Sequence, residues 1–217
     1  MIMRIMPVIA IGAVVVGLLG GASAPALAAP PGAPRAVAAK ADPPPMTNKC
    51  RKQFKSGFRQ KLLHDDWAHA YDYYEGRRKA EQAMYDQLRW MLADPQAQDL
   101  IPGLEAAAAS DRAAYQPVIA KQRDENYKDL KQFERKFTAS GCLTSARSRN
   151  IFKDAMRLLR ASFQDIYKAH EKLFGVNLAI QTAQADLAGQ YMSDADLEAA
   201  TVEENMHNAW TQARRLY

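Results

Sequence analysis

Two cysteines, Cys50 and Cys142, are the only ones in the chain and limit how it can fold. In an oxidising compartment they are expected to form one disulfide, which would also leave no free thiol for catalysis. A disulfide requires the two Cα atoms to lie within about 7 Å of each other. We therefore predict a fold in which the chain leaves Cys50, turns back, and returns to the same end at Cys142.

The start of the chain predicts export to such a compartment. Arg4 precedes an uncharged apolar run, VIAIGAVVVGLL, and Ala26-Leu27-Ala28 fits the small-x-small pattern of a cleavage site. The apolar run covers about 12 residues, whereas a membrane span needs roughly 20. We therefore expect a signal peptide over residues 1–28, a periplasmic or secreted protein, and no transmembrane segment after processing.

Residues 29–46 (APPGAPRAVAAKADPPPM) follow this signal and are rich in proline and alanine. The segment has almost no large apolar side chains, so it cannot bury a core and is expected to be a disordered linker. The folded part is then one domain over residues 47–217, long enough for a modest core.

From Thr47 onward the sequence is rich in helix-favouring residues, and no alternating strand pattern of useful length is present. Proline and glycine positions, together with Ser193 as an N-cap, predict helices over 48–93, 117–138, 145–189 and 194–216. An up-down arrangement of these helices brings Cys50 and Cys142 to the same end. We predict an all-α fold, an elongated antiparallel bundle of three to four long helices joined by one disulfide.

The segment HDDWAHAYDYYEG, residues 64–76, raises the question of a binding site on the first helix. At 100° per residue, Trp67, Tyr71 and Tyr74 share a strong apolar stripe, whereas Asp65, Asp72 and Glu75 face solvent. A weaker second stripe lies near His69 and contains Phe58, Leu62, Tyr73, Ala80 and Ala83. Two stripes indicate either a central helix or a helix with one face against a partner, and they leave His69 and Tyr73 open to binding.

The same helical geometry constrains possible metal and small-ligand sites. Asp66-x-x-His69 and Glu204-x-x-His207 resemble the spacing of di-metal bundles, but they point away from the strong apolar stripes, so no metal site is predicted. His170 lies on the apolar stripe of the third helix. It is expected to be a hydrogen-bonded core residue with a depressed pKa. The alternative is a ligand site formed by His170 and Tyr167.

Basic residues are concentrated around the predicted disulfide end. Between residues 35 and 61 there are eight lysines and arginines and one acid. This pattern favours contact with an acidic protein surface or another anionic surface, while export argues against nucleic acid. The residues expected to contact a partner are Lys49, Arg51, Lys52, Lys55, Phe58, Arg59, Leu62, His69 and Tyr73.

None of the common catalytic motifs is present, neither G-x-S-x-G nor H-E-x-x-H, nor a phosphate loop or a haem-attachment motif. We therefore expect a non-catalytic protein without a cofactor. It would bind another envelope or secreted protein as an adaptor, inhibitor, immunity factor or secretion-apparatus component. The alternatives are a small-ligand or metal-binding bundle and, less favoured, an enzyme acting on cell-wall glycan.

Overall fold

A computed structural model describes residues 46–216 of the chain. The predicted signal peptide and all of the predicted linker except Met46 lie outside the described residues. Within residues 46–216 every regular element is helical and no strand is present, which confirms the all-α prediction. No helix in this range is both long and apolar enough to cross a bilayer.

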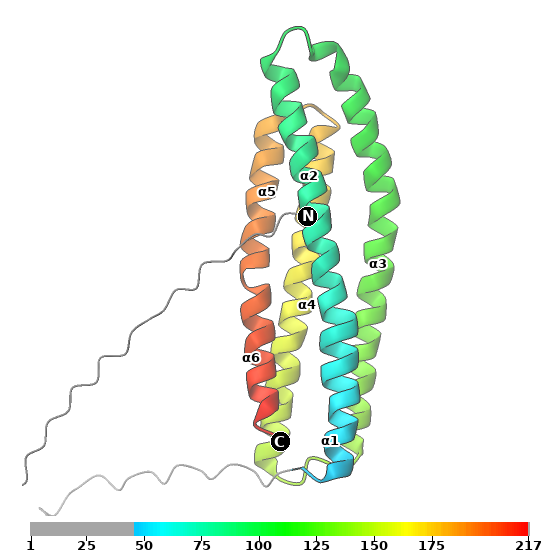
Figure 1. The fold of residues 1–217 in the computed structure, drawn as a ribbon, viewed down its shortest axis with the longest axis vertical. Helices are drawn as coiled ribbons and strands as arrows, with labels where there is room; N and C mark the ends of the chain where they lie inside the picture. The colour runs from blue at the N-terminus through cyan, green and yellow to red at the C-terminus, as the bar shows by residue number, and fades with distance from the viewer. Residues whose placement is uncertain (1–45, 217) are drawn as a thin grey trace, which may run out of the picture. The chain divides into compact units, whose positions relative to one another are not determined.

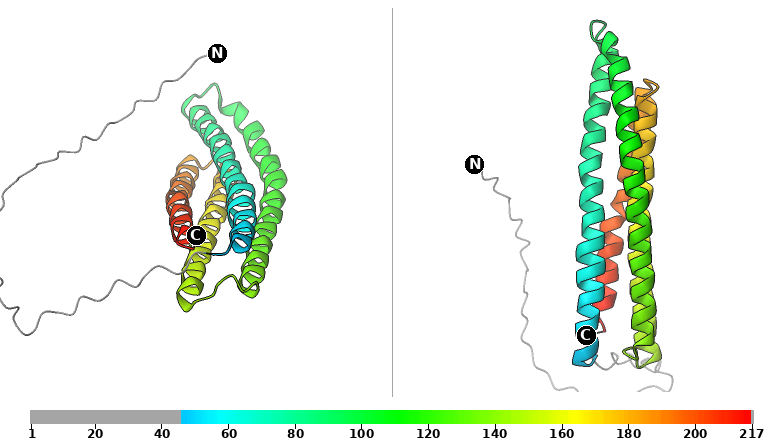
Figure 2. Two further views of the ribbon diagram at one scale, coloured as in Figure 1. Left: turned by 60° about the horizontal axis from the view of Figure 1, so that its bottom comes forward. Right: turned by 90° about the vertical axis from the view of Figure 1, so that its right-hand side faces the viewer.

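The helices run in four antiparallel passes (Figures 1 and 2). The first pass is continuous and consists of α1 (Asn48–Phe54), the π-helix η1 (Lys55–Ala68) and α2 (His69–Ala93). A short 3₁₀ turn, η2 (Gln98–Leu100), leads into the second pass, α3 (Ile101–Ala139). The third pass is α4 (Ala146–Ile180), and the fourth is divided into α5 (Ala185–Ala200) and α6 (Val202–Arg214).

The predicted disulfide is confirmed. The sulfur atoms of Cys50 and Cys142 are bonded, and their Cα atoms lie 5.5 Å apart. Thr47 caps α1 by accepting a hydrogen bond from the backbone N–H of Cys50 at 3.3 Å, which fixes the start of the first pass. The bond joins the beginning of α1 to the loop that follows α3, so both points lie at the same end of the bundle, as the up-down arrangement requires.

Helix α4 is the central element of the bundle. It contacts α2, α3, α5 and α6, and its buried face runs from Ile151 to Ile180. Its start is fixed by a reciprocal pair of hydrogen bonds, in which Ser145 and Ser148 each accept from the other's backbone N–H at 3.0 Å. The apolar stripe predicted for this helix is the face that packs in the core.

Three predicted helix boundaries were wrong. The second helix starts at Ile101 rather than near Pro117, because Pro117 lies on an exposed face inside α3 and the helix continues through it. The third helix ends at Ile180 rather than near residue 189. Ala183 has φ 50°, which turns the chain out of the helix, and the backbone N–H of Gln184 donates a hydrogen bond to the carbonyl of Ala179 at 2.9 Å. This is the usual helix-ending turn, with alanine in the place where glycine is typical.

A further consequence of this ending is that Ser193 does not cap a helix. It lies inside α5, and the break in the fourth pass falls at Thr201, between α5 and α6. The predicted helix 194–216 is therefore the last part of α5 together with α6.

The π-helix η1 changes which residues of the first pass face the core. A π-helix bonds i to i+5, so each turn holds more residues than an α-helix and the angle per residue is below 100°. Residues five apart, such as Leu62 and Trp67, therefore lie closer to one face than they would in an α-helix, and both are buried together with Phe54 and Phe58. Gly57 permits this packing, because a Cβ at that position would overlap the ring of Phe133.

The weak stripe that we considered as a partner-facing surface is therefore partly inside the bundle. Phe58 and Leu62 are fully buried, so their side chains offer no surface to a partner, and we remove them from the candidate contact residues. Tyr73 is half-buried, and Ala83 is exposed. The first pass contacts both α3 and α4.

Candidate functional site

The predicted basic residues lie at the disulfide end of the bundle. Lys49, Lys52, Lys55 and Arg59 are exposed on α1 and η1. Arg51 is half-buried instead, and its Nε donates a hydrogen bond to the carbonyl of Met46 at 3.0 Å. The exposed members are therefore available to a partner, whereas Arg51 also holds the chain that enters α1.

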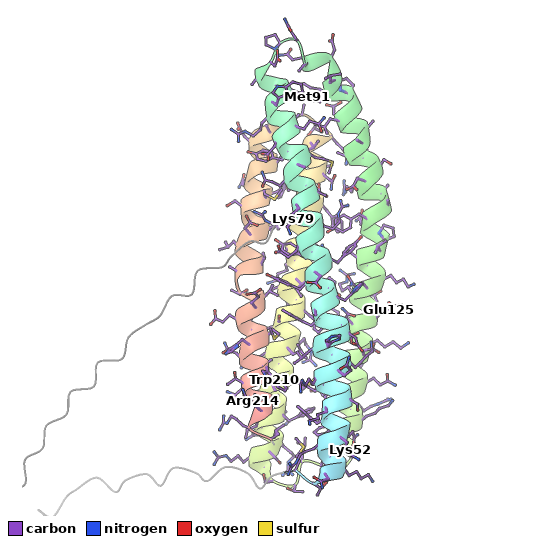
Figure 3. The ribbon with its side chains drawn as sticks, in the orientation of Figure 1. Lys52, Lys79, Met91, Glu125, Trp210 and Arg214 are labelled. Carbon is purple, nitrogen blue, oxygen red and sulfur yellow. A yellow bond between two sulfur atoms is a disulfide. The ribbon has the colours of Figure 1, made fainter. Side chains whose placement is uncertain are left out.

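Charge is strongly segregated along the bundle. Ion pairs of Lys61 with Asp129 and of Arg160 with Glu134 join neighbouring passes at a level nearer to the disulfide end of the bundle than to its other end. Residues 47–61, 128–160 and 206–216, on the disulfide side of that level, contain 17 lysines and arginines and three acids. The rest of residues 46–216 contains nine lysines and arginines and 20 acids. We call the first of these two parts the basic half and the second the acidic half. Figure 3 labels Lys52 and Arg214 in the basic half and Lys79 in the acidic half.

The two other predicted contact residues, His69 and Tyr73, line a separate surface groove between the first pass and α3. The groove has a volume of about 410 Å³. The first pass contributes Asp65, Asp66, His69 and Tyr73. Helix α3 contributes Val118, Lys121, Gln122, Glu125 and Asn126. The structure therefore divides the predicted contact residues between two places, the basic end and this groove.

Asp66 is the unexpected member of the groove, because the 100° spacing predicted a position away from the packed stripe. The structure leaves it only 6% exposed. It lies at the end of η1, where the wider turn rotates it inward. Its Oδ1 accepts a hydrogen bond from Lys61 Nζ at 2.5 Å, and its Oδ2 has no partner. Burial raises the pKa of this carboxyl despite the nearby lysine.

A buried polar network crosses the core between α2, α3 and α4. The Arg77 guanidinium forms a two-point ion pair with Asp111 and donates to Glu81 Oε1 at 2.6 Å. Asn177 Nδ2 donates to the same Glu81 oxygen at 2.7 Å. The guanidinium also lies 4.2 Å from the ring centre of Tyr115. Arg77 thus pairs with two carboxylates, Asp111 and Glu81, of which Glu81 is fully buried.

His170 and Tyr167, the alternative ligand residues, are both in the core. His170 is fully buried, its Nδ1 is hydrogen-bonded to the Tyr115 hydroxyl, and the rings of Tyr73 and Tyr74 lie beside it. Tyr167 accepts a hydrogen bond from Asn126 Nδ2 at 2.8 Å. Neither side chain lines the groove, but Tyr167 orients Asn126, which does.

Burial and the charge of Arg77 lower the pKa of His170 to about 3, as expected for a core histidine. Burial raises the pKa of Glu81 to about 7, because desolvation outweighs the hydrogen bonds from Arg77 and Asn177. Glu81 Oε2 has no hydrogen-bond partner, which also favours the protonated form. The two groups therefore titrate in opposite directions from their unfolded pKa values.

These shifts predict an unusual dependence of stability on pH. As pH falls below about 6.5 the unfolded chain protonates His170 and the folded chain does not, so this residue lowers stability. Glu81 does the reverse, since the folded chain takes up its proton near pH 7 and the unfolded chain only near 4.5. The two contributions offset each other between about pH 4.5 and 6.5.

Replacing Glu81 with glutamine should remove this offset. On acidification from pH 6.5 to 4.5, the E81Q variant should lose about 1.4 kcal/mol per pH unit more than the wild type. Urea unfolding at several pH values measures the difference, with E171Q at an exposed position as the control. Parallel curves for the wild type and E81Q would show that Glu81 does not take up the proton.

Neither the buried polar network nor the burial of Asp66 was predicted from the sequence, although the sequence contained one signal for the network. Glu81 lies seven residues after Tyr74 and seven before Leu88, so it falls on the strong apolar stripe of the first helix. An acid at such a position predicts a buried charge with a partner. Asp66 had no such signal, because its burial depends on η1.

Within residues 46–216, no cluster of three or more His, Cys, Asp or Glu side chains is placed to hold a metal ion. Comparisons with protein-family models, curated proteins and solved structures found no match to this chain. The basic half, the groove and the buried network are the features of the described residues that bear on function.

Proposed function

We propose that the chain is an exported, non-catalytic helical protein that binds an acidic surface of another envelope or secreted protein through its basic half. The observation that carries the proposal is the segregation of charge, with 17 basic residues against three acids on the disulfide side. Clustered charge of one sign accelerates association with a surface of the opposite sign and selects against other surfaces.

Exposure and rigidity support the same proposal. Lys49, Lys52, Lys55 and Arg59 are exposed on consecutive turns of α1 and η1, and the disulfide ties this segment to the loop after α3. The bond to Cys142 thus joins basic residues of the first pass to those at the end of α3 and the start of α4. A rigid array of this kind recognises a partner with less loss of conformational entropy than a disordered basic tail would.

The test is an affinity capture with the processed protein, expected to be residues 29–217, from the envelope fraction at low and high salt. A double charge reversal, Lys52→Glu with Lys55→Glu, should reduce capture of the partner about tenfold at low salt. The matched control, Lys79→Glu with Lys121→Glu, changes the charge equally in the acidic half and should leave capture unchanged.

The outcomes separate the proposal from its alternatives. A partner that is lost at high salt and in the Lys52/Lys55 variant supports the basic half as the interface. Equal binding by both variants would overturn the proposal. Binding to vesicles of anionic lipid with the same salt and variant dependence, and to no protein, would replace a protein partner with a lipid surface.

A further inference from the structure

The groove between the first pass and α3 is separate from the basic half and has a chemistry of its own. Its volume of about 410 Å³ is in the range of small-molecule sites. It opens where η1 gives way to α2, and π-helical segments occur frequently at functional sites. The groove also contains the His69 and Tyr73 side chains that the sequence left open to binding.

The wall formed by the first pass presents an incompletely satisfied carboxylate. Asp66 lines the groove, is more than nine-tenths buried, and has one oxygen without a hydrogen-bond partner. Lys61 contacts the other oxygen but also pairs with Asp129 at 2.7 Å, so its charge is shared between two carboxylates. A second donor at Asp66 would therefore satisfy a buried acceptor that the chain itself leaves open.

The opposite wall, on α3, also contains a buried hydrogen-bond acceptor without a partner. Gln122 Oε1 is buried and has no hydrogen-bond partner. Glu125, labelled in Figure 3, is exposed on the next turn. Asn126 is fixed by its hydrogen bond to Tyr167. Buried and exposed acceptors thus line both sides, and Tyr73 and Val118 add apolar surface between them.

We infer that this groove binds a small organic amine, with ammonium N–H groups donated to Asp66 and Gln122 and the alkyl part packed against Tyr73 and Val118. An ammonium carries several donors and no acceptor, which matches a lining with unpaired acceptors. An aromatic face such as that of Tyr73 also attracts an organic cation. A metal ion fits less well, since no set of three ligating side chains converges within residues 46–216.

Lys121 is the one formally positive side chain among the described residues that line the groove. Its Nζ lies 3.9 Å from Glu125, so it offsets the negative charge on this wall of the groove and repels a bound amine. Removing this charge should strengthen binding, whereas removing Asp66 or Glu125 should weaken it. A nonspecific structural effect would not produce opposite signs at neighbouring residues.

The experiment is a calorimetric titration of the purified protein with 1,4-diaminobutane and with spermidine, using uncharged 1,4-butanediol as the ligand control. One amine per chain is expected, with no binding of the diol. Asp66→Asn should weaken binding about tenfold, Glu125→Gln should weaken it about threefold, and Lys121→Met should strengthen it several-fold. Asp154→Asn, an exposed acid on α4, should leave it unchanged.

Each result decides the inference. Saturable binding with these opposite changes supports an amine site in the groove. Absence of binding, equal binding of the diol, or equal affinities in all four variants would overturn it. Glu125 is exposed, so Glu125→Gln remains a valid test if Asp66→Asn disturbs the packing of the bundle.

Discussion

Replacing both Cys50 and Cys142 with serine should lower the free energy of unfolding by about 4–5 kcal/mol. The bond spans 92 residues, and closing a loop of that length removes considerable entropy from the unfolded chain. The same loss corresponds to a decrease in Tm of about 10–20 °C for a domain of this size. Urea unfolding of the serine variant beside the oxidised wild type gives the value directly.

The control for this prediction is the wild-type protein unfolded under reducing conditions, which should match the serine variant. Agreement between the two would assign the loss to the bond rather than to the new hydroxyl groups. A loss below about 1 kcal/mol would mean that the unfolded chain already keeps the two ends together, because the entropic gain would then be absent.

Arg77→Met should cost about 3 kcal/mol at pH 8, because it leaves the fully buried Glu81 without its charged partner. The cost should be smaller at pH 6. Burial raises the pKa of Glu81 to about 7, so at the lower pH this carboxyl can be neutral in the folded state. Urea unfolding at the two pH values measures both effects.

A neighbouring arginine provides the matched control. Arg78 pairs with Asp196 at 2.5 Å, but that acid is 45% exposed, so Arg78→Met should cost less than about 1 kcal/mol. Adding Glu81→Gln to Arg77→Met should restore at least half of the lost stability, since glutamine keeps the bond from Asn177 without a buried charge. No recovery in the double variant would mean that packing of Arg77 against Tyr115 carries the effect.

Much of the fold followed from local signals in the sequence. The first pass was predicted over residues 48–93 and ends at Ala93, because the residue before a proline disfavours the helical conformation and Asp94 is extended. The disulfide and the antiparallel arrangement followed from two cysteines in a helical chain. The burial of His170 followed from its position on the apolar stripe of α4.

The parts that were missed depend on contacts made elsewhere in the chain. Pro117 was predicted to mark a helix start, but an exposed proline costs one backbone hydrogen bond, and the surrounding turns of α3 keep the helix intact. Ala183 ends α4 in a conformation that normally needs glycine, so no local residue signalled it. The burial of Asp66 depends on the π-helical winding of η1. The angle of 100° per residue used for prediction holds only for an α-helix, and it therefore placed Asp66 away from the packed stripe.

Three polar side chains of the first two passes fix the lengthwise alignment of α4. Trp67 bonds Ser162 at 2.7 Å, Glu81 accepts from Asn177 at 2.7 Å, and Tyr115 bonds His170. Apolar rows alone would tolerate a shift of α4 by one helical turn, about 5.4 Å. Such a shift would leave all three buried groups without partners at once, so the bundle has one favoured register.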